Sequence, residues 1–271
     1  MRNLRRSSRA GAVLLVGALA LVLSLPAGGN AAPTQPSQAR DTEPVATSLR
    51  IVTFNTAAGV GPAKAMADLR TVLAQEPDVV ALQEMSSWKK RKRVIDQVIC
   101  GENGVDRGAE VPTTCAYAGW VPIPAVQGGL PILWRKDKFQ LMGHDWVLAA
   151  PETYVGARGA GPSTMHAKYV VRVRLKDLAT GRNIWILNTH FVPTVQKSSG
   201  GRNANKRRIA LYSKHMTSLA SMVAGLRTKG LVFVTGDFNV NYRKDKVARD
   251  PVFPLRRARC CGAHADLRLG R

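Results

Sequence analysis

The residues best suited to chemistry in this 271-residue sequence follow directly after runs of apolar, β-prone residues. Asn55 ends LRIVTFN, Glu84 follows DVVALQ, His190 ends WILNTH, and Asp237 and Asn239 belong to VTGDFN. Carboxylate and amide oxygens are suitable ligands for Mg²⁺, Mn²⁺ or Ca²⁺, and a nearby imidazole can shuttle a proton or hydrogen-bond a phosphoryl oxygen. Zinc is a poorer match, because the set contains one histidine and no thiolate.

Each of these residues also has a purely structural interpretation. Asn55 could cap a loop, Glu84 could pair with a lysine of the basic run that follows it, and His190 could be a hydrogen-bonded structural histidine. Residues 231–241 alone could be a strand followed by an ordinary Asp/Asn turn. The same switch from apolar to polar at four strand ends favours a shared site, because open α/β sheets place their chemistry at the carboxyl ends of strands.

The elements that must position these residues alternate between strands and helices. Residues 49–55 and 78–83 have strand patterns, and residues 62–75 between them carry helical apolar spacing, which together predict a βαβ-type unit. The apolar stripe from Ile209 to Leu226 predicts the clearest helix of the chain. Further strands are predicted at residues 130–135, 139–148, 168–175, 183–187 and 231–235.

Five segments, LRIVTFN, DVVALQE, ILWRKDKF, WILNTH and VTGDFN, together resemble the endonuclease/exonuclease/phosphatase superfamily of nucleases, inositol-phosphate phosphatases and bacterial sphingomyelinases. The resemblance covers residues 49–241 and implies an α/β fold with a two-layer β sandwich flanked by helices. It implies that Asn55 and Glu84 belong to a divalent-metal site and that His190 is one member of a catalytic histidine pair. It also implies that Asp237 and Asn239 orient the attacking water and the scissile phosphate, with Asp237 as general base.

The end of the sequence departs from that family pattern. Similar proteins continue past GDFN through two strands and an Asp-His pair, whereas no aspartate here is followed directly by histidine. His264 and Asp266 lie in GAHAD, which does not match, so neither is given a catalytic role. We therefore expect the last strands to be missing and residues 255–271 to be an atypical tail. A frameshift or premature end is favoured over a non-catalytic descendant. Loss of the last strands would leave an open sheet edge, which a binding protein would have no reason to tolerate.

The start of the sequence resembles a secretory leader. Four arginines precede an uncharged apolar run over residues 11–25 and a small-residue exit, so residues 1–32 are predicted to be a signal peptide. The run is shorter than the roughly 20 residues of a membrane anchor. Residues 33–47 are predicted to be a flexible linker before a domain at residues 48–254. We expect a secreted protein without a transmembrane segment once the leader is removed, in which Cys100 and Cys115 can form a disulfide.

The charge of the chain favours polyanionic partners. Loss of the four leader arginines lowers the formal net charge from +22 to +18. The run KKRKR at residues 89–93 and the set Arg202, Lys206, Arg207 and Arg208 are either contacts for such partners or solvated faces. We expect nucleic acid or another phosphodiester as the substrate, with no stable protein partner inferred. The alternatives are a sphingomyelinase-like lipid phosphodiesterase and a catalytically impaired polyanion-binding protein.

Overall fold

The computed structural model describes residues 48–99, 116–122, 129–156 and 164–254. The expected signal peptide, linker and atypical tail lie outside the described residues, as do Cys100 and Cys115, so these expectations stay predictions. None of the helices in the described ranges is long and apolar enough to cross a membrane.

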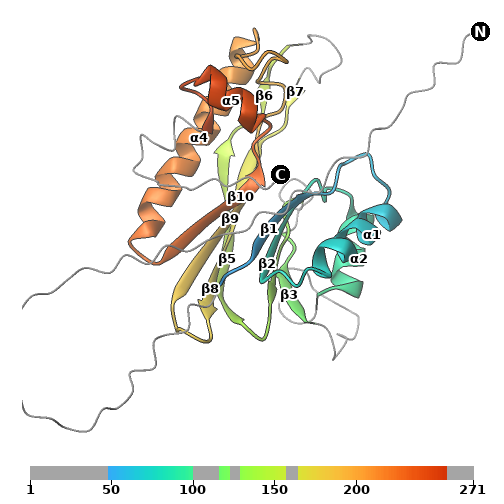
Figure 1. The fold of residues 1–271 in the computed structure, drawn as a ribbon. Coiled ribbons are helices and arrows are strands. Elements are labelled where there is room, and N and C mark those ends of the chain that lie inside the picture. The colour runs from blue at the N-terminus through green and yellow to red at the C-terminus, as the bar shows by residue number, and fades with distance from the viewer. Residues whose placement is uncertain (1–47, 100–115, 123–128, 157–163, 255–271) are drawn as a thin grey trace, which may run out of the picture.

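Two four-stranded sheets stack against each other at the centre of the fold (Figure 1). The first sheet has the order β1-β2-β4-β3 and the second has the order β10-β9-β8-β5. The strands of the first sheet are β1 (Ile51–Asn55), β2 (Val79–Gln83), β3 (Tyr117–Trp120) and β4 (Ile132–Arg135). Those of the second are β5 (Phe139–Ala150), β8 (Lys168–Asp177), β9 (Asn183–His190) and β10 (Leu231–Asp237), and a separate small hairpin consists of β6 (Thr153–Tyr154) and β7 (Thr164–Met165).

Each sheet contains one parallel pair of strands, and these two pairs carry the predicted site residues. β1 pairs with β2 and β9 pairs with β10 in parallel, whereas the other neighbours in both sheets are antiparallel. The register places Asn55 opposite Gln83 and His190 opposite Asp237. Because the two strands of a parallel pair end on the same side, each sheet presents its polar residues at the carboxyl ends of these strands.

Helices cover the outer faces of both sheets (Figure 1). α1 (Pro62–Leu73) and α2 (Trp88–Gln97) pack on the first sheet, α4 (Lys206–Arg227) packs on the second, and α5 (Tyr242–Ala248) follows β10. α1 starts with Pro62, whose fixed φ and missing N–H suit the first helical position. α4 is capped by Asn205, whose side chain accepts a hydrogen bond from the backbone N–H of Arg208 at 3.0 Å.

The apolar core consists of three layers, one between the sheets and one beneath the helices on each side. Successive residues of a strand point to opposite faces, so β8 gives Val170 to the α4 layer and Val171 to the central layer. In the same way, β2 gives Val79 to the central layer and Val80 to the layer under α1 and α2. Burial on both faces explains why these strands appear in the sequence as nearly continuous apolar runs.

The predicted α/β fold, a two-layer β sandwich flanked by helices, is confirmed. Every predicted strand and both predicted helices are present, with shifts of a few residues at their ends. The sequence patterns missed α2, α5, β3 and the β6–β7 hairpin. The sequence pattern did not predict α2, because the basic run occupies its first half and its few apolar residues are too sparse to show a helical period. Within the described residues β10 is an edge strand, and the expected absence of further family strands stays a prediction.

Gly236 allows β10 to end in close contact with β9. Its φ is +146°, and a Cβ at this position would lie 2.2 Å from the carbonyl oxygen of Thr189. We expect Gly236→Ala to lower the free energy of unfolding by about 2–4 kcal/mol, because it combines backbone strain with a backbone clash. Chemical denaturation measures this change.

The matched control is Gly225→Ala in α4, where an added Cβ meets nothing within 4 Å. Replacing a helical glycine by alanine is expected to raise the free energy of unfolding by about 0.5–1 kcal/mol. A Gly236→Ala protein that unfolds at the same denaturant concentration as the wild type would contradict the role assigned to Gly236.

Candidate active site

Glu84, His190 and Asp237 come together where β2, β9 and β10 end. Each offers one ligand atom, and these atoms all lie within 4.8 Å of one another. His190 Nε2 lies 3.7 Å from Glu84 Oε1 and 3.8 Å from Asp237 Oδ2. Glu84 follows a strand of the first sheet, whereas His190 and Asp237 belong to the second. The cluster therefore spans the sandwich and depends on the alignment of its two sheets.

Asn55 lies between the two carboxylates. Its Nδ2 donates to Asp237 Oδ2 at 2.9 Å and to Glu84 Oε1 at 3.2 Å. Its Oδ1 accepts a hydrogen bond from the backbone N–H of Ala57 at 2.8 Å. In this arrangement Asn55 joins the carboxylates through its nitrogen, and its oxygen is turned to the backbone. The assignment of Asn55 as a metal ligand stays a prediction.

Asn239 fixes Asp237 and joins the ends of β9 and β10. Its backbone is left-handed, with a φ of 53°, and its N–H donates to Asp237 Oδ1 at 2.7 Å. Its Nδ2 donates to the carbonyl oxygen of Phe191, the residue after His190, at 3.0 Å. Both oxygens of Asp237 thus accept a hydrogen bond, one from Asn239 and one from Asn55. The predicted role of Asn239 toward water and phosphate stays a prediction.

Lys168 is a site residue that the sequence pattern did not reveal. It begins β8 beside β9, and its side chain makes no hydrogen bond or ion pair within the described part of the chain. Burial lowers the pKa of Lys168, whereas the charges of Glu84 and Asp237 raise it. In KYVVRVRL the basic residues Lys168, Arg172 and Arg174 all fall on the same face of the strand, so nothing in the pattern distinguishes Lys168 from the other cations.

The environment of His190 favours the neutral imidazole. Burial lowers the pKa of His190, and the charge of Lys168 lowers it further. The charges of Asp237 and Glu84 act in the opposite direction, raising the pKa. A neutral ring can donate one N–H and accept a proton at its other nitrogen.

The donor set fits a hard divalent cation. Two carboxylates that face each other are stabilised by positive charge between them, and their oxygens match the preferences of Mg²⁺, Mn²⁺ and Ca²⁺. In the described ranges, Glu84, His190 and Asp237 form the single group of three or more such side chains close enough to hold an ion.

One histidine, rather than a pair, reaches this site in the part of the chain that the structure describes. His144 stacks on Trp120 with a centroid separation of 4.4 Å, and His166 is exposed beside Glu152. His215 is buried in α4, and His264 lies outside the described residues. The expected second member of a catalytic pair is therefore not found among the described side chains.

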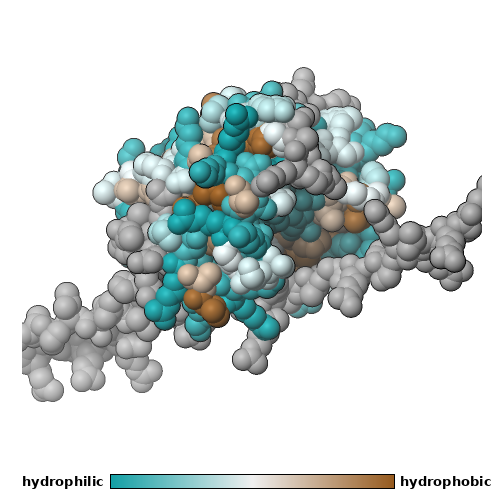
Figure 2. All heavy atoms as spheres, turned by 90° about the horizontal axis from the view of Figure 1, so that it is seen from above, coloured by the Kyte–Doolittle hydropathy of each residue, from teal (hydrophilic) through white to brown (hydrophobic). Residues whose placement is uncertain are grey.

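The two basic runs are not uniform surface patches. In the first, Lys90 and Arg91 are buried, whereas Lys89, Lys92 and Arg93 are exposed. In the second, Arg208 is buried and Arg202 forms an ion pair with Asp250 at 2.6 Å. Seen from above, the described surface is largely hydrophilic and carries small, separate hydrophobic patches (Figure 2). Only part of each run is thus available to a polyanion.

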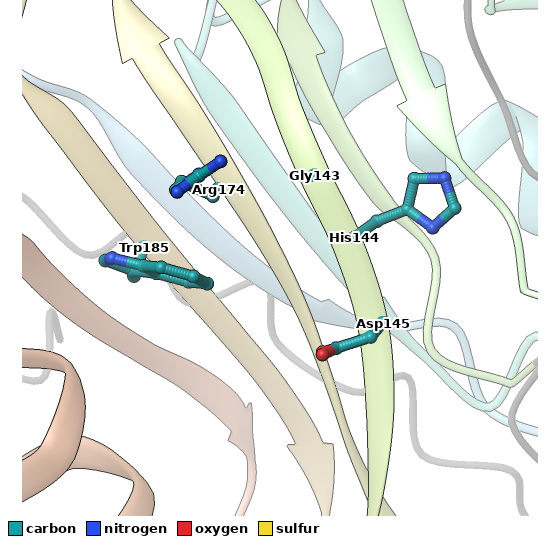
Figure 3. Close-up of a pocket in the computed structure, with 5 residues that line it drawn as sticks. All are labelled: Gly143, His144, Asp145, Arg174 and Trp185. Atoms are coloured by element: carbon teal, nitrogen blue, oxygen red, sulfur yellow. The ribbon is translucent and has the colours of Figure 1, made fainter.

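The second sheet carries a hollow that is lined by residues of β5, β8 and β9 (Figure 3). Arg174 lies over the ring of Trp185 at 5.7 Å from its centroid and donates to the carbonyl oxygen of Met142 at 3.0 Å. None of the predicted site residues lines it, so the chemistry expected of Glu84, His190 and Asp237 is not located there. The lining residues are Gly143, His144, Asp145, Arg174 and Trp185.

The fold and the site define an α/β sandwich protein whose polar edge combines carboxylates, amides and an imidazole. A family model described as "Endonuclease/Exonuclease/phosphatase family" matches residues 52–257, which include every predicted site residue. The chain therefore belongs to the endonuclease/exonuclease/phosphatase family, and the predicted resemblance is confirmed at this level. A comparison with curated proteins finds no match.

Several solved structures are similar to this chain at low identity. Humanized D. rerio TDP2 is 14% identical with a TM-score of 0.48, and the match covers 73% of this chain and 65% of that one. The human nocturnin catalytic domain with bound sulfate is 15% identical with a TM-score of 0.39, covering 65% and 56%. A Bacteroides thetaiotaomicron member of the family is 17% identical with a TM-score of 0.47, covering 75% and 69%. The chain thus spans less than two thirds of the length of the first two of these proteins.

His215 is buried in α4 between the two residues that flank His190. Its Nε2 lies 2.8 Å from Thr189 Oγ1, and its ring stacks on Phe191 with a centroid separation of 3.8 Å. The Thr189 hydroxyl donates to the carbonyl oxygen of Tyr169 at 2.8 Å, so the ring must donate its Nε2–H to Thr189. Burial lowers the pKa of His215 to about 3, and Lys168 and His190 contribute smaller effects in the same direction.

This depressed pKa makes stability depend on pH. The unfolded chain binds a proton on His215 near its ordinary pKa of about 6.5, whereas the folded chain binds it only near pH 3. The stabilisation is therefore complete above about pH 6.5 and is lost as the pH falls toward 3, at roughly 1 kcal/mol per pH unit. We expect His215→Gln to show a flatter decline of unfolding free energy between pH 7 and pH 4.5, measured by denaturation at about five pH values.

His166→Gln is the matched control, because it makes the same change at an exposed histidine outside the core. Identical pH slopes for the wild type and His215→Gln would contradict the assignment of a buried neutral ring to His215.

Proposed function

We propose that this chain is a secreted, divalent-metal-dependent phosphoesterase that hydrolyses phosphodiester bonds, with nucleic acid as its substrate class. The observation that carries the proposal is the convergence of Glu84, His190 and Asp237, whose ligand atoms lie within 4.8 Å of one another. Membership of the endonuclease/exonuclease/phosphatase family supports the reaction class. The leader pattern at residues 1–32 supports export.

Each residue of the cluster has a distinct place in the proposed reaction. Glu84 would hold the ion, Mg²⁺ or else Mn²⁺ or Ca²⁺, with Asn55 beside it. A bound divalent ion supplies neutralisation of the charge that develops on phosphoryl oxygens. Asp237 would accept the proton of the attacking water, since Asn55 and Asn239 fix the direction of its two oxygens. His190 would donate a hydrogen bond to a phosphoryl oxygen.

Lys168 would add a second source of positive charge. Its ammonium group is partly buried, feels the charges of both carboxylates and makes no hydrogen bond or ion pair among the described residues. A partly buried cation at a phosphoesterase site can bind a non-bridging oxygen of the substrate with less competition from water than a fully exposed one. This arrangement suits an anionic substrate better than a neutral one.

One observation favours a second function. The described residues provide one histidine of the expected pair, so a catalytically impaired protein that binds polyanions would also retain this geometry. Such a protein would bind nucleic acid in a salt-sensitive manner without turnover. Turnover, rather than binding, therefore separates the two functions.

The first test compares hydrolysis of DNA, RNA, sphingomyelin and a generic phosphodiester by residues 33–271, with Mg²⁺ and with a chelator. We expect Mg²⁺-dependent turnover of nucleic acid, lowered about 10²–10⁴-fold in kcat/KM by Asp237→Ala or His190→Ala, because each removes a group that acts in proton transfer or charge stabilisation. Asp145→Ala and His166→Ala are the matched controls, since both residues are exposed and lie outside the cluster.

Turnover that survives Asp237→Ala and His190→Ala would exclude the proposed site. Salt-dependent DNA binding without turnover would instead support the impaired polyanion-binding protein, and preferential turnover of sphingomyelin would support the lipid phosphodiesterase alternative.

Lys168→Met tests the proposed phosphate contact. We expect kcat/KM on DNA to fall about 10–100-fold, because a cation at the developing negative charge is lost. We also expect the salt dependence of DNA binding to weaken by about one phosphate contact. Lys176→Met, an exposed position in the same strand, removes the same charge away from the site. Equal kinetics for the two variants would show that Lys168 does not contact the substrate.

A further inference from the structure

Helix α2 buries two cations near its start. Lys90 and Arg91 are 1% and 3% exposed, although both belong to the basic run KKRKR. A buried charge is unfavourable unless it is hydrogen-bonded, and a cation at a helix N-terminus also faces the positive end of the helix dipole. Contacts elsewhere must offset both effects, and these contacts lead to the candidate active site.

Lys90 is joined to Glu84 through a single peptide group. Its Nζ donates to the carbonyl oxygen of Ala57 at 2.7 Å and lies 3.5 Å from that of Ala58. The Ala57 carbonyl and the Ala58 N–H belong to the same peptide, and this N–H donates to Glu84 Oε2. A trans peptide is planar and points its C=O and N–H in opposite directions. The peptide therefore lies between the ammonium group and the carboxylate.

This connection determines which oxygen of Glu84 faces the site. Because Oε2 accepts from Ala58, Oε1 is the oxygen that faces Asn55 Nδ2 at 3.2 Å and His190 Nε2 at 3.7 Å. Hydrogen bonds in a chain polarise one another, so the ammonium group strengthens the donor that holds Oε2. Burial lowers the pKa of Lys90 and the charge of Glu84 raises it, as expected for two groups that act on each other across the peptide.

Arg91 holds the backbone on the other side of Glu84. Its Nη1 donates to the carbonyl oxygens of Ser86 at 2.6 Å and Met85 at 3.2 Å, the two residues that follow Glu84. Glu84 and Ala57 both have left-handed backbones, with φ of 60° and 56°, although neither is glycine. Such conformations persist where the surroundings fix them. Lys90 hydrogen-bonds the loop that contains Ala57, and Arg91 hydrogen-bonds the loop that follows Glu84. The two cations thereby hold the left-handed backbones of Ala57 and Glu84 in place.

We infer that Lys90 and Arg91 are positioning residues, which hold Glu84 in the orientation that binds the divalent cation. The inference rests on the proposed function, because it assigns Glu84 to the ion. It also divides the basic run by role. Its inward half maintains the geometry of the site, and its outward half, Lys89, Lys92 and Arg93, remains in contact with solvent.

The test compares Lys90→Met with Lys89→Met, which removes the same charge from the exposed side of the helix. The first readout is hydrogen exchange of the Ala58 amide by NMR without metal, and the second is Mn²⁺ affinity by electron paramagnetic resonance. We expect Lys90→Met to accelerate Ala58 exchange about tenfold and to weaken Mn²⁺ binding about 10–100-fold, as for other residues that orient metal ligands. Lys89→Met should match the wild type, and Lys90→Arg, which keeps a charged donor, should restore most of both.

Unchanged Ala58 exchange, or equal Mn²⁺ affinity in the two Met variants, would overturn the inference. If Lys90→Met does not fold, Lys90→Gln gives the same comparison, because it removes the charge and shortens the side chain that donates to Ala57. Wild-type protein that binds no Mn²⁺ would refute the proposed metal site, and with it the positioning of Glu84 for an ion. In that case the exchange comparison alone would still decide whether Lys90 holds the Ala57–Ala58 peptide.

Discussion

Buried hydrogen bonds between the two sheets determine whether the candidate site can exist. Gln83 of β2 donates to Asn188 of β9 at 2.7 Å, and Asn188 donates to the carbonyl oxygen of Leu82 at 2.7 Å. Both amide side chains are fully buried. Hydrophobic contacts between the sheets are non-directional and would allow one sheet to slide over the other. A buried amide that loses its hydrogen-bond partner, in contrast, costs about 1–3 kcal/mol. Because Glu84 follows Gln83 and His190 lies two residues after Asn188, this alignment brings the cluster together.

The same alignment places charges of both signs in a confined space. Glu84 and Asp237 would repel each other, and the fold answers with donors and cations taken from different elements: Asn55 from β1, Lys168 from β8 and, through a peptide, Lys90 from α2. None of these groups neutralises the two carboxylates completely by direct contact. A divalent ion would neutralise the negative charge that remains on Glu84 and Asp237. The packing of the sandwich, which brings these carboxylates together, is thereby linked to the proposed chemistry.

The sequence allowed prediction of the elements and of the residues at strand ends, because both depend on local patterns. Apolar runs that switch to Asn, Glu, His and Asp identified four strand ends, and the sheet topology brought these ends to one place. Lys168, Lys90 and Arg91 could not be found in this way. Whether a cation is buried depends on which face of its strand or helix packs inward, and the basic runs showed no periodicity that would tell one face from the other.

The buried cations also change how the net charge of the chain should be interpreted. A high positive charge predicts affinity for polyanions only to the extent that the cations reach the surface, and several of those counted here do not. Lys90 and Arg91 bind backbone carbonyls, and Arg202 pairs with Asp250, so none of these three has its charge fully available to a phosphate. Lys168 differs from them, because the charges of Glu84 and Asp237 raise its pKa although it makes no hydrogen bond or ion pair among the described residues. Specificity for a phosphodiester would therefore depend more on this single partly buried cation than on the basic runs that dominate the sequence.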